Sequence, residues 1–209
     1  MTARIEQVRT SGTFALDGEN IAVENNVWLV GDDHEVVVVD PAHDAAAIAE
    51  AVGERRVLTI LCTHGHNDHI NAALPLSQQV GAPICIHSND AILWAAVHGT
   101  RRPDRWLRDG DQIAVAGTTL EVLLTPGHTP GGVCLHLPAL GAVLTGDTLF
   151  QGGPGATGRS YSDFPTLIHS LTERLLPLPP ATVVHTGHGP STTIGAEAPH
   201  LAEWVARGR

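Results

Sequence analysis

The sequence is short of basic residues, of long apolar runs and of cysteine, and each shortage excludes a class of protein. The 209 residues carry 12 basic side chains against 22 acidic ones, a formal net charge of −10, and the longest basic run is the pair Arg101–Arg102. A phosphate backbone is bound by clustered positive charge, so we expect a small-molecule substrate and no nucleic-acid partner.

The apolar runs are too short to cross a membrane. No segment approaches the roughly 18 apolar residues of a spanning helix. Charged side chains from Arg4 to Glu19 interrupt the start of the chain, where a leader peptide would need an apolar block. We therefore expect a cytoplasmic protein with no membrane partner.

Cysteine is rare and scattered. Cys62, Cys85 and Cys134 are odd in number, far apart and set in apolar runs. This pattern predicts buried, reduced thiols in the core rather than disulfides or a cysteine-based zinc site.

Apolar residues are plentiful, at 43% of the chain, and occur in short runs separated by turn signals. This suits one domain over residues 1–209, since single cores commonly extend to roughly 250 residues. Residues 25–44 read as two strands joined by a Gly-Asp-Asp turn, residues 44–53 as a helix closed by Gly53, and residues 56–63 as a buried strand. Further strands are predicted in residues 82–87, 112–117, 118–127, 132–138, 141–150 and 182–190, and helices in residues 162–176, capped by Ser162 or Asp163, and 195–208. No linker or repeat divides these segments, so the pattern predicts one layered α/β domain.

A cluster of metal-binding residue types follows the strand at residues 56–63. The stretch "ILCTHGHNDHINAA", residues 60 to 73, places His64, His66, Asp68 and His69 within six positions. The composition gives only about 0.003 expected chance matches to this pattern, so chance is a poor explanation. The cluster should lie at the C-terminal end of a strand and open the next helix.

Three further candidate ligands stand at the ends of later strands. His128 in "TPGHTPGG", Asp147 in "TGDTLF" and His188 in "HTGHGP" each follow an apolar run and sit beside glycines that allow a sharp turn. A single histidine at a strand end is usually a surface residue, but the cluster favours convergence. Five imidazoles and two carboxylates without thiolate suit zinc or iron, and seven ligands are too many for one ion. The residues therefore predict two divalent ions, zinc first, with iron or a zinc and iron mixture as alternatives.

Other polar residues carry weaker signals. Asp40, His87 and His185 lie near strand ends, where they are candidates to contact and orient a ligand, although a plain turn or capping role also fits. The remaining histidines stand apart from any cluster and are expected to be solvated or to cap elements: His34, His43, His98, His136, His169 and His200.

The motifs "THGHNDH", "TPGHTPG", "GDTLF" and "TGHGP", in this order over residues 63 to 190, resemble the metallo-β-lactamase superfamily, and most closely its glyoxalase II (hydroxyacylglutathione hydrolase) branch of thioester hydrolases. The resemblance implies a four-layer αββα sandwich with a dinuclear metal site along one edge of the two sheets. It also implies how the candidate ligands divide: Asp147 bridges the two ions, one ion is held by His64, His66 and His128, and the other by Asp68, His69 and His188.

The resemblance to glyoxalase II does not extend to its additional C-terminal helical region, whose basic residues bind glutathione. Only residues 189–209 follow His188 here. The loop "QGGPGATGRSYSDF", residues 151–164, resembles hydrolases of actinobacterial type, in which mycothiol replaces glutathione. We expect Arg159 or Tyr161 in this loop to bind the polar half of such a small thiol; a surface turn with Arg159 paired locally is the plain alternative.

Such a site implies hydrolysis without a side-chain nucleophile. Two divalent ions lower the pKa of a shared water toward neutrality and stabilise the oxyanion formed at a carbonyl. Asp68 would both ligate and accept a hydrogen bond from the bridging hydroxide, which orients its attack. The motifs contain no separate general acid, and a thiolate with a parent pKa of roughly 8.5 leaves without one, so thioesters are favoured over amides.

Three other functions stay open. A persulfide dioxygenase of the same superfamily resembles the same motif but uses one iron, held by the equivalents of His64, His128 and Asp147. A β-lactamase is disfavoured because such enzymes are usually exported. A non-catalytic metal-binding module is disfavoured because an open ligand set is a poor metal store and no ligand is missing. The sequence does not indicate an oligomeric state.

Overall fold

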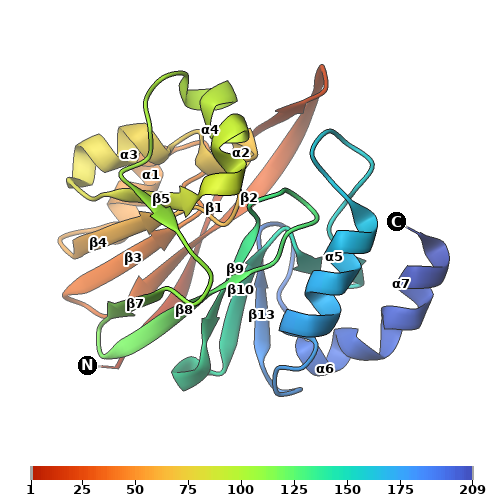
Figure 1. Ribbon diagram of the computed structural model, residues 1–209. Coiled ribbons are helices and arrows are strands. Elements are labelled where there is room, and N and C mark those ends of the chain that lie inside the picture. The colour runs from red at the N-terminus through yellow and green to blue at the C-terminus, as the bar shows by residue number, and fades with distance from the viewer. Residues whose placement is uncertain (1, 209) are drawn as a thin grey trace.

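Two six-stranded β-sheets lie face to face at the centre of the protein, and helices cover the outer face of each sheet (Figure 1). The computed structural model describes residues 2–208. The first sheet has the order β1-β2-β3-β4-β5-β6, with β1 Arg4–Leu16, β2 Glu19–Gly31, β3 Glu35–Val39, β4 Arg56–Leu61, β5 Ile84–His87 and β6 Arg105–Leu107. The second has the order β14-β13-β10-β9-β8-β7, with β7 Gln112–Val115, β8 Thr118–Leu124, β9 Val133–Leu137, β10 Ala142–Gly146, β13 Val183–Thr186 and β14 Thr192–Thr193. A short hairpin of β11 Leu149–Phe150 and β12 Gly153–Pro154 follows β10.

The helices divide between the two outer faces of the sandwich. The first sheet is covered by α1 Ala45–Val52, α2 Asn67–Ile70, α3 Ala73–Val80 and α4 Ala91–His98. The second is covered by α5 Phe164–Ser170, which continues into the π-helical turn Leu171–Leu175, and by α6 Ile194–Glu197 and α7 Leu201–Arg207. The prediction of a four-layer αββα sandwich is confirmed. Within residues 2–208, no helix has the length and apolar character needed to cross a membrane.

The core consists of three apolar layers, and residues alternate along a strand between two of them. In β3, Val36 and Val38 lie in the layer that contains Ile48 of α1, whereas the intervening valines lie between the sheets with Leu135 of β9. All the valines of β3 have no exposed surface, which confirms a strand buried on both faces. The third layer lies under α5 and α7 and includes Trp204. The three cysteines are buried and free, as predicted.

Parallel pairing directs polar residues from several strands to one edge. β3 and β4 are parallel neighbours in the first sheet, and β10 and β13 are parallel neighbours in the second. The residues that follow these strands include Asp40, His64, Asp147 and His188. At the same edge the amide of Asn26 in β2 donates to the carbonyl of Gly187 at 2.8 Å and joins the two sheets. The fold thus gathers segments that are distant in the sequence.

The N-terminal hairpin is the main element that the sequence predictions do not include. β1 and β2 pair antiparallel along their whole length, so the strand expected over residues 25–31 is only the second half of β2. The turn is Asp17-Gly18, with φ of 53° and 79°. An Asp-Gly pair between alternating strands matches the twist of a tight hairpin, and this pair is the signal that could have revealed it. In Figure 1 the hairpin projects toward the loop before α5.

The prediction for the last helix needs correction. Residues 195–208 do not form one helix: α6 ends at Glu197, a 3₁₀ turn spans Ala198–His200, and α7 follows. Pro199 lacks the N–H that a helix interior requires, which explains the break. The helix predicted over residues 162–176 begins at Phe164, and its N-cap is Asp163, one of the two caps predicted for it, whose side chain accepts a hydrogen bond from the amide of Thr166.

Candidate metal centre

The histidine cluster lies where β4 gives way to α2, as the sequence predicts. β4 ends at Leu61, His66 precedes the first residue of α2, and Asp68 and His69 lie within this single-turn helix. The side chains of these residues and of His64 are at most 5% exposed. Buried polar groups need partners, so the neighbours of each ring nitrogen and carboxylate oxygen indicate what this cluster can bind.

One group of facing donor atoms belongs to His64, His66 and His128, and these atoms lie within 4.8 Å of one another. Nε2 of His128 lies 3.0 Å from Nδ1 of His66. The other ring nitrogen of His128 lies 2.8 Å from the carbonyl oxygen of Ala156, to which it can only donate. Nε2 of the neutral ring therefore carries a lone pair toward the other two histidines.

A second group belongs to Asp68, His69 and His188, again within 4.8 Å. The two Nε2 atoms of the histidines are 3.2 Å apart. Oδ2 of Asp68 lies 3.3 Å from Nε2 of His188 and 3.6 Å from Nε2 of His69. Nδ1 of His188 donates to the carbonyl oxygen of Glu24 at 2.7 Å, which turns Nε2 toward the group.

Asp147 lies between the two groups. Its Oδ1 is 3.3 Å from Nε2 of His69, and its Oδ2 is 3.4 Å from Nε2 of His188 and 3.6 Å from Nε2 of His128. Gly187 packs directly against this carboxylate: a Cβ at that position would lie 2.2 Å from Oδ1. Asp147 therefore faces both groups, as a bridging carboxylate must.

The donor atoms are placed to bind metal ions rather than to form hydrogen bonds with one another. Four buried atoms of the candidate ligands have no hydrogen-bond partner within the part of the chain that the structure describes: Nε2 of His64, Nε2 of His66, Oδ1 of Asp68 and Oδ1 of Asp147. An unpaired buried polar atom costs about 1–3 kcal/mol. Two ligands about 2.1 Å from one tetrahedral ion lie about 3.4 Å apart, which matches the approaches of 3.0–3.6 Å between neighbouring side chains here. The residues fit two divalent ions.

Electrostatics separate the histidines into two kinds. Burial lowers the pKa of His64 well below its ordinary value and lowers the pKa of His66 to about 3, so both rings are neutral and available as ligands. Burial also opposes charge on His69 and His188, but the carboxylate of Asp147 helps to outweigh it, so the pKa of His69 is raised well above its ordinary value and that of His188 to about 10. Ions bound by these two histidines must therefore displace protons.

Asp40 orients two of the candidate ligands through hydrogen bonds, His69 directly and His64 through Thr63. Its Oδ2 lies 3.0 Å from Nδ1 of His69 and accepts the hydroxyl proton of Thr63 at 2.7 Å. The Thr63 oxygen is then left to accept from Nδ1 of His64 at 3.0 Å. In both histidines Nδ1 donates, so Nε2 is the lone-pair atom. The backbone of Asp40 has a φ of 53°, an uncommon left-handed conformation at the position where the sequence places an orienting residue.

Asn25 is a supporting residue that the sequence predictions miss. Its Nδ2 donates to Oδ2 of Asp68 at 3.1 Å and lies 3.3 Å from Nε2 of His69. Its Oδ1 lies 2.8 Å from Nε2 of His43, whose Nδ1 lies 3.0 Å from Nδ2 of Asn71. The Asn71 amide can only donate, so His43 must donate from Nε2 and Asn25 must turn its NH₂ group toward Asp68. The expectation that His43 is solvated or caps an element is wrong.

Asp90 is a second supporting residue without a signal in the sequence, where "HSND" reads as an ordinary turn. It is fully buried. Its Oδ2 accepts from the amide of Gly65 and the hydroxyl of Thr129, both at 2.7 Å, and its Oδ1 accepts from the amide of Gly131. The carboxylate thus ties the loop that bears His64 and His66 to the loop that bears His128.

Three other histidines lie away from the centre. Nδ1 of His87 accepts from the amide of Asn89 at 3.3 Å, and Nδ1 of His185 lies 3.1 Å from the hydroxyl of Ser191. Among the hydrogen bonds of residues 2–208, neither histidine contacts a candidate ligand. His98 is half-buried and donates from Nε2 to the main chain of α2 at 2.9 Å, so the expectation that it is solvated or caps an element needs correction.

A cavity of about 400 Å³ opens onto the cluster. Five candidate ligands form its floor: His66, Asp68, His128, Asp147 and His188. Its walls come from the β1–β2 hairpin and from the loop before α5, and include Phe14, Ile21, Val23, Ala156, Arg159, Ser160 and Ser162. Arg159 reaches the cavity, but its Nη1 donates to Oε2 of Glu19 at 2.6 Å. Tyr161 is 47% exposed and is not among the described residues that line the cavity.

An αββα sandwich with a histidine and aspartate cluster at one edge of its sheets is a framework that can hold metal ions. A family model of the metallo-beta-lactamase superfamily matches residues 21–188, which include every candidate ligand. The chain belongs to this superfamily, as its motifs predict. Members of the superfamily are mostly metal-dependent hydrolases, and the cluster described above supplies the groups that can hold metal.

Individual relatives extend the comparison. The chain is similar to the hydroxyacylglutathione hydrolase GloC of Haemophilus influenzae, with 34% identity over 192 residues that cover 84% of this chain and 91% of the relative. Among solved structures it is similar to TTHA1623 in a di-iron-bound form, with a TM-score of 0.76 and 32% identity over 90% of this chain and 96% of the other. It is also similar to ETHE1 from Myxococcus xanthus, with a TM-score of 0.70 and 28% identity over 92% of this chain and 83% of the other.

Proposed function

We propose that the protein is a dinuclear metal-dependent hydrolase that cleaves thioesters of a small thiol. The observation that carries this proposal is that both donor groups are complete and that Asp147 faces each of them. The similarity to a hydroxyacylglutathione hydrolase supports a thioester as the substrate class. The similarity to a structure that binds iron keeps iron beside zinc as a candidate metal.

The chemistry divides between the ions and the chain. When bound, two divalent ions would supply the Lewis acidity that activates water and polarises a carbonyl. Asp68 has a positional role: Oδ2 accepts from Asn25, whereas Oδ1 has no hydrogen-bond partner among the described residues. The carboxylate is held at one oxygen and can orient a water with the other, which fixes the direction of attack on a substrate in the cavity.

The cavity favours a leaving group that needs no proton. Outside the candidate ligands, the proton donors among its described lining side chains are Arg159, Ser160 and Ser162. Arg159 is paired with Glu19, and the hydroxyl of Ser162 already donates to the main chain of Arg159 at 2.7 Å. An amine must be protonated to leave, whereas a thiolate with a parent pKa of roughly 8.5 leaves without a general acid. This supports thioesters over amides.

The loop before α5 is the part of the wall that we propose to contact the thiol carrier. Arg159 and Ser160 border the cavity, and Tyr161 stands beside them at the surface. We propose a carrier other than glutathione, such as a thiol of the mycothiol type, because the loop presents its one guanidinium already paired with a carboxylate.

Metal analysis and turnover on the same preparation test the proposal. Protein purified without added metal and then loaded with zinc should hold close to two ions per chain and release thiol from thioesters of several carriers. An amide with the same acyl group should react at least about 100-fold more slowly, because the site has no general acid to protonate the leaving amine. Protein that holds two ions and releases thiol from no thioester would refute the proposal.

A mononuclear iron persulfide dioxygenase is the second candidate. It needs His64 and His128, which share one donor group, and Asp147, which faces that group, and the similarity to ETHE1 from Myxococcus xanthus favours testing it. One iron per chain at saturation, together with oxygen uptake in the presence of a persulfide, would support this function. The complete group of Asp68, His69 and His188 would then have no role, which is why the hydrolase is preferred.

A further inference from the structure

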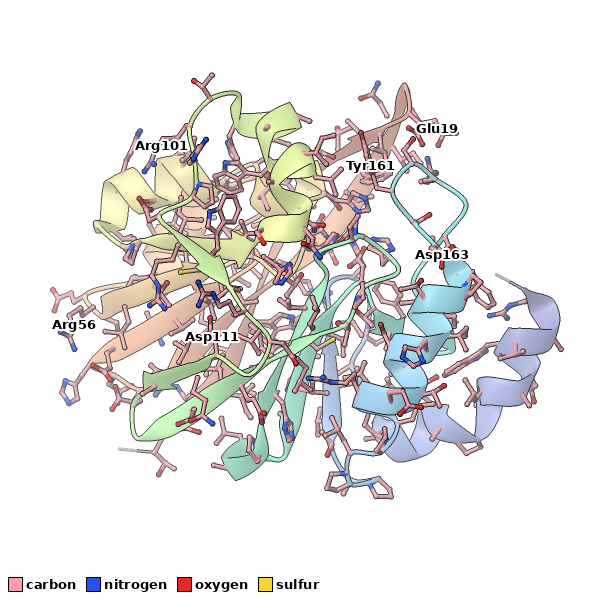
Figure 2. The ribbon with its side chains drawn as sticks, viewed as in Figure 1. Glu19, Arg56, Arg101, Asp111, Tyr161 and Asp163 are labelled. Carbon is pink, nitrogen blue, oxygen red and sulfur yellow. The ribbon has the colours of Figure 1, made fainter. Side chains whose placement is uncertain are left out.

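The hairpin tip and the loop before α5 are bonded to each other at the wall of the cavity. Nη1 of Arg159 donates to Oε2 of Glu19 at 2.6 Å, and the amide of Ser160 donates to Oδ2 of Asp17 at 2.9 Å. The guanidinium carbon of Arg159 also lies 5.4 Å from the ring centroid of Phe14, within the range of a cation–π contact. Figure 2 shows Glu19 at the hairpin tip, near the loop that carries Tyr161.

The ion pair of Arg159 with Glu19 neutralises the positive charge of the cavity wall. Arg159 is the only lysine or arginine among the described residues that line the cavity. Its partner Glu19 does not line the cavity, so the ion pair points the carboxylate away from the ligand space. The other charged wall residue, Glu24, lies 3.6 Å from Arg9. Within the described lining, no cation outside the metal cluster is left to bind a carboxylate or phosphate of a substrate.

The rest of the hairpin wall is apolar. Phe14, Ile21 and Val23 face the cavity from the two strands, and Ile21 is 42% exposed. Such a wall is suited to uncharged groups, because it offers a charged group no partner. An anionic group at this wall would also approach Glu24, which lines the cavity, and like charges at a binding site discriminate against a ligand.

We infer that the cavity selects thioesters in which both the acyl chain and the thiol carrier are uncharged, and that Glu19 sets this specificity by neutralising Arg159. The inference rests on the proposed thioester hydrolysis and specifies its substrate class. It assigns Glu19 a specificity role although its side chain lies outside the cavity. It also predicts that the charge of Arg159 becomes available to a ligand when Glu19 loses its own.

Two thioesters with the same butanoyl group separate charge from size. One carries N-acetylcysteamine, which is uncharged, and the other carries 3-mercaptopropionate, which has one negative charge. For the metal-loaded wild-type protein we expect kcat/KM to be at least about tenfold higher for the uncharged thioester. Glu19→Gln keeps the side-chain shape and frees Arg159, so kcat/KM for the anionic thioester should rise about tenfold, with less than about a twofold change for the uncharged one.

Two further variants serve as controls. Glu24→Gln removes the same charge from the same wall but leaves the pair of Arg159 and Glu19 intact, so the ratio of the two kcat/KM values should change less than about threefold. Arg159→Gln in the Glu19→Gln background should abolish the gain on the anionic thioester, because the freed charge is then absent.

Calorimetric binding of the corresponding S-butyl thioethers gives a readout that does not require turnover. Any contact between the carboxylate and a metal is common to all the variants, so a change in the ratio of the two affinities reports Arg159. Equal preference of the wild type for the two ligands, or unchanged ratios in Glu19→Gln, would overturn the inference. If no thioester is hydrolysed but the affinity ratio shifts as expected, the proposed function fails and the preference of the cavity for uncharged ligands stands.

Discussion

Replacement of Gly187 by alanine tests whether close packing behind Asp147 holds the metal centre in place. A Cβ at Gly187 would lie 2.2 Å from Oδ1 of Asp147 and 2.7 Å from Cε1 of His69. Ordinary contacts between such atoms are roughly 3.5 Å, so the methyl group would overlap both side chains. Asp147 is enclosed by His69, His128 and His188 and cannot retreat without changing its position between the two donor groups.

Gly187→Ala should lower both the unfolding free energy and the affinity for metal. Overpacking a buried site costs about 1–3 kcal/mol in unfolding free energy, which lowers the Tm of a chain of this size by about 2–4 °C per kcal/mol. The effect on metal should be larger in relative terms. Displacing a group that orients one ligand lowers metal affinity about 10–100-fold, and Gly187→Ala displaces two candidate ligands at once. We therefore expect at least about a 100-fold loss of affinity for the more weakly bound ion.

The assay combines a metal titration against a competing chelator with calorimetric unfolding of the metal-free protein. Gly189→Ala is the matched control. Gly189 has a φ of 67°, and a Cβ added there would have no atom within 4 Å, so alanine costs about 1 kcal/mol through the backbone alone. It should lower the Tm without changing metal content. Gly187→Ala protein that keeps wild-type metal affinity and turnover would refute the reasoning.

Four other outcomes follow from the same contacts. Asp147→Ala should lose at least one ion and nearly all activity while the circular dichroism spectrum is unchanged; two ions with normal turnover would show that it does not bridge. Asn25→Ala should lower the kcat of the metal-saturated protein about tenfold, because Asp68 loses its donor; an unchanged kcat would rule out that support. Asp90→Ala leaves two amides and a hydroxyl unpaired and should lower the unfolding free energy by about 3 kcal/mol in urea titrations, whereas an unchanged midpoint would contradict this. A chelator should lower the Tm of the loaded protein by removing a ligand of the native state yet leave its secondary structure intact, since the apolar layers do not involve the metal.

The ligand positions could be predicted because they lie at or shortly after the ends of apolar runs. Asp147 comes directly after β10, and His188 follows β13 after one intervening glycine, so a reading of strand ends is sufficient to find them. Asp40 could be named for the same reason, since it ends β3 beside the cluster. The family resemblance supplied the αββα arrangement, which alternation of strands and helices alone leaves open between several layered folds.

The supporting residues Asn25 and Asp90 could not be predicted because their partners are remote in sequence. Asn25 contacts Asp68, 43 positions away, and Asp90 contacts Gly131, 41 positions away. Nothing near Asn25 distinguishes it from the neighbouring Asn26, which instead joins the two sheets. The hairpin β1–β2 was missed for a different reason: its alternating polar and weakly apolar residues resemble a solvated segment, and only the Asp17-Gly18 pair marks the turn.

The division of the candidate ligands between the two sheets has a consequence for the order of assembly. Each donor group takes two members from the segment that follows β4 and only one from a later strand end, His128 in one group and His188 in the other. The first half of the chain therefore holds an incomplete pair for each ion. During translation neither site can close until the second sheet has docked, and the second group must wait for His188 to be synthesised. Metal uptake at these two groups would then report a finished sandwich rather than direct its folding.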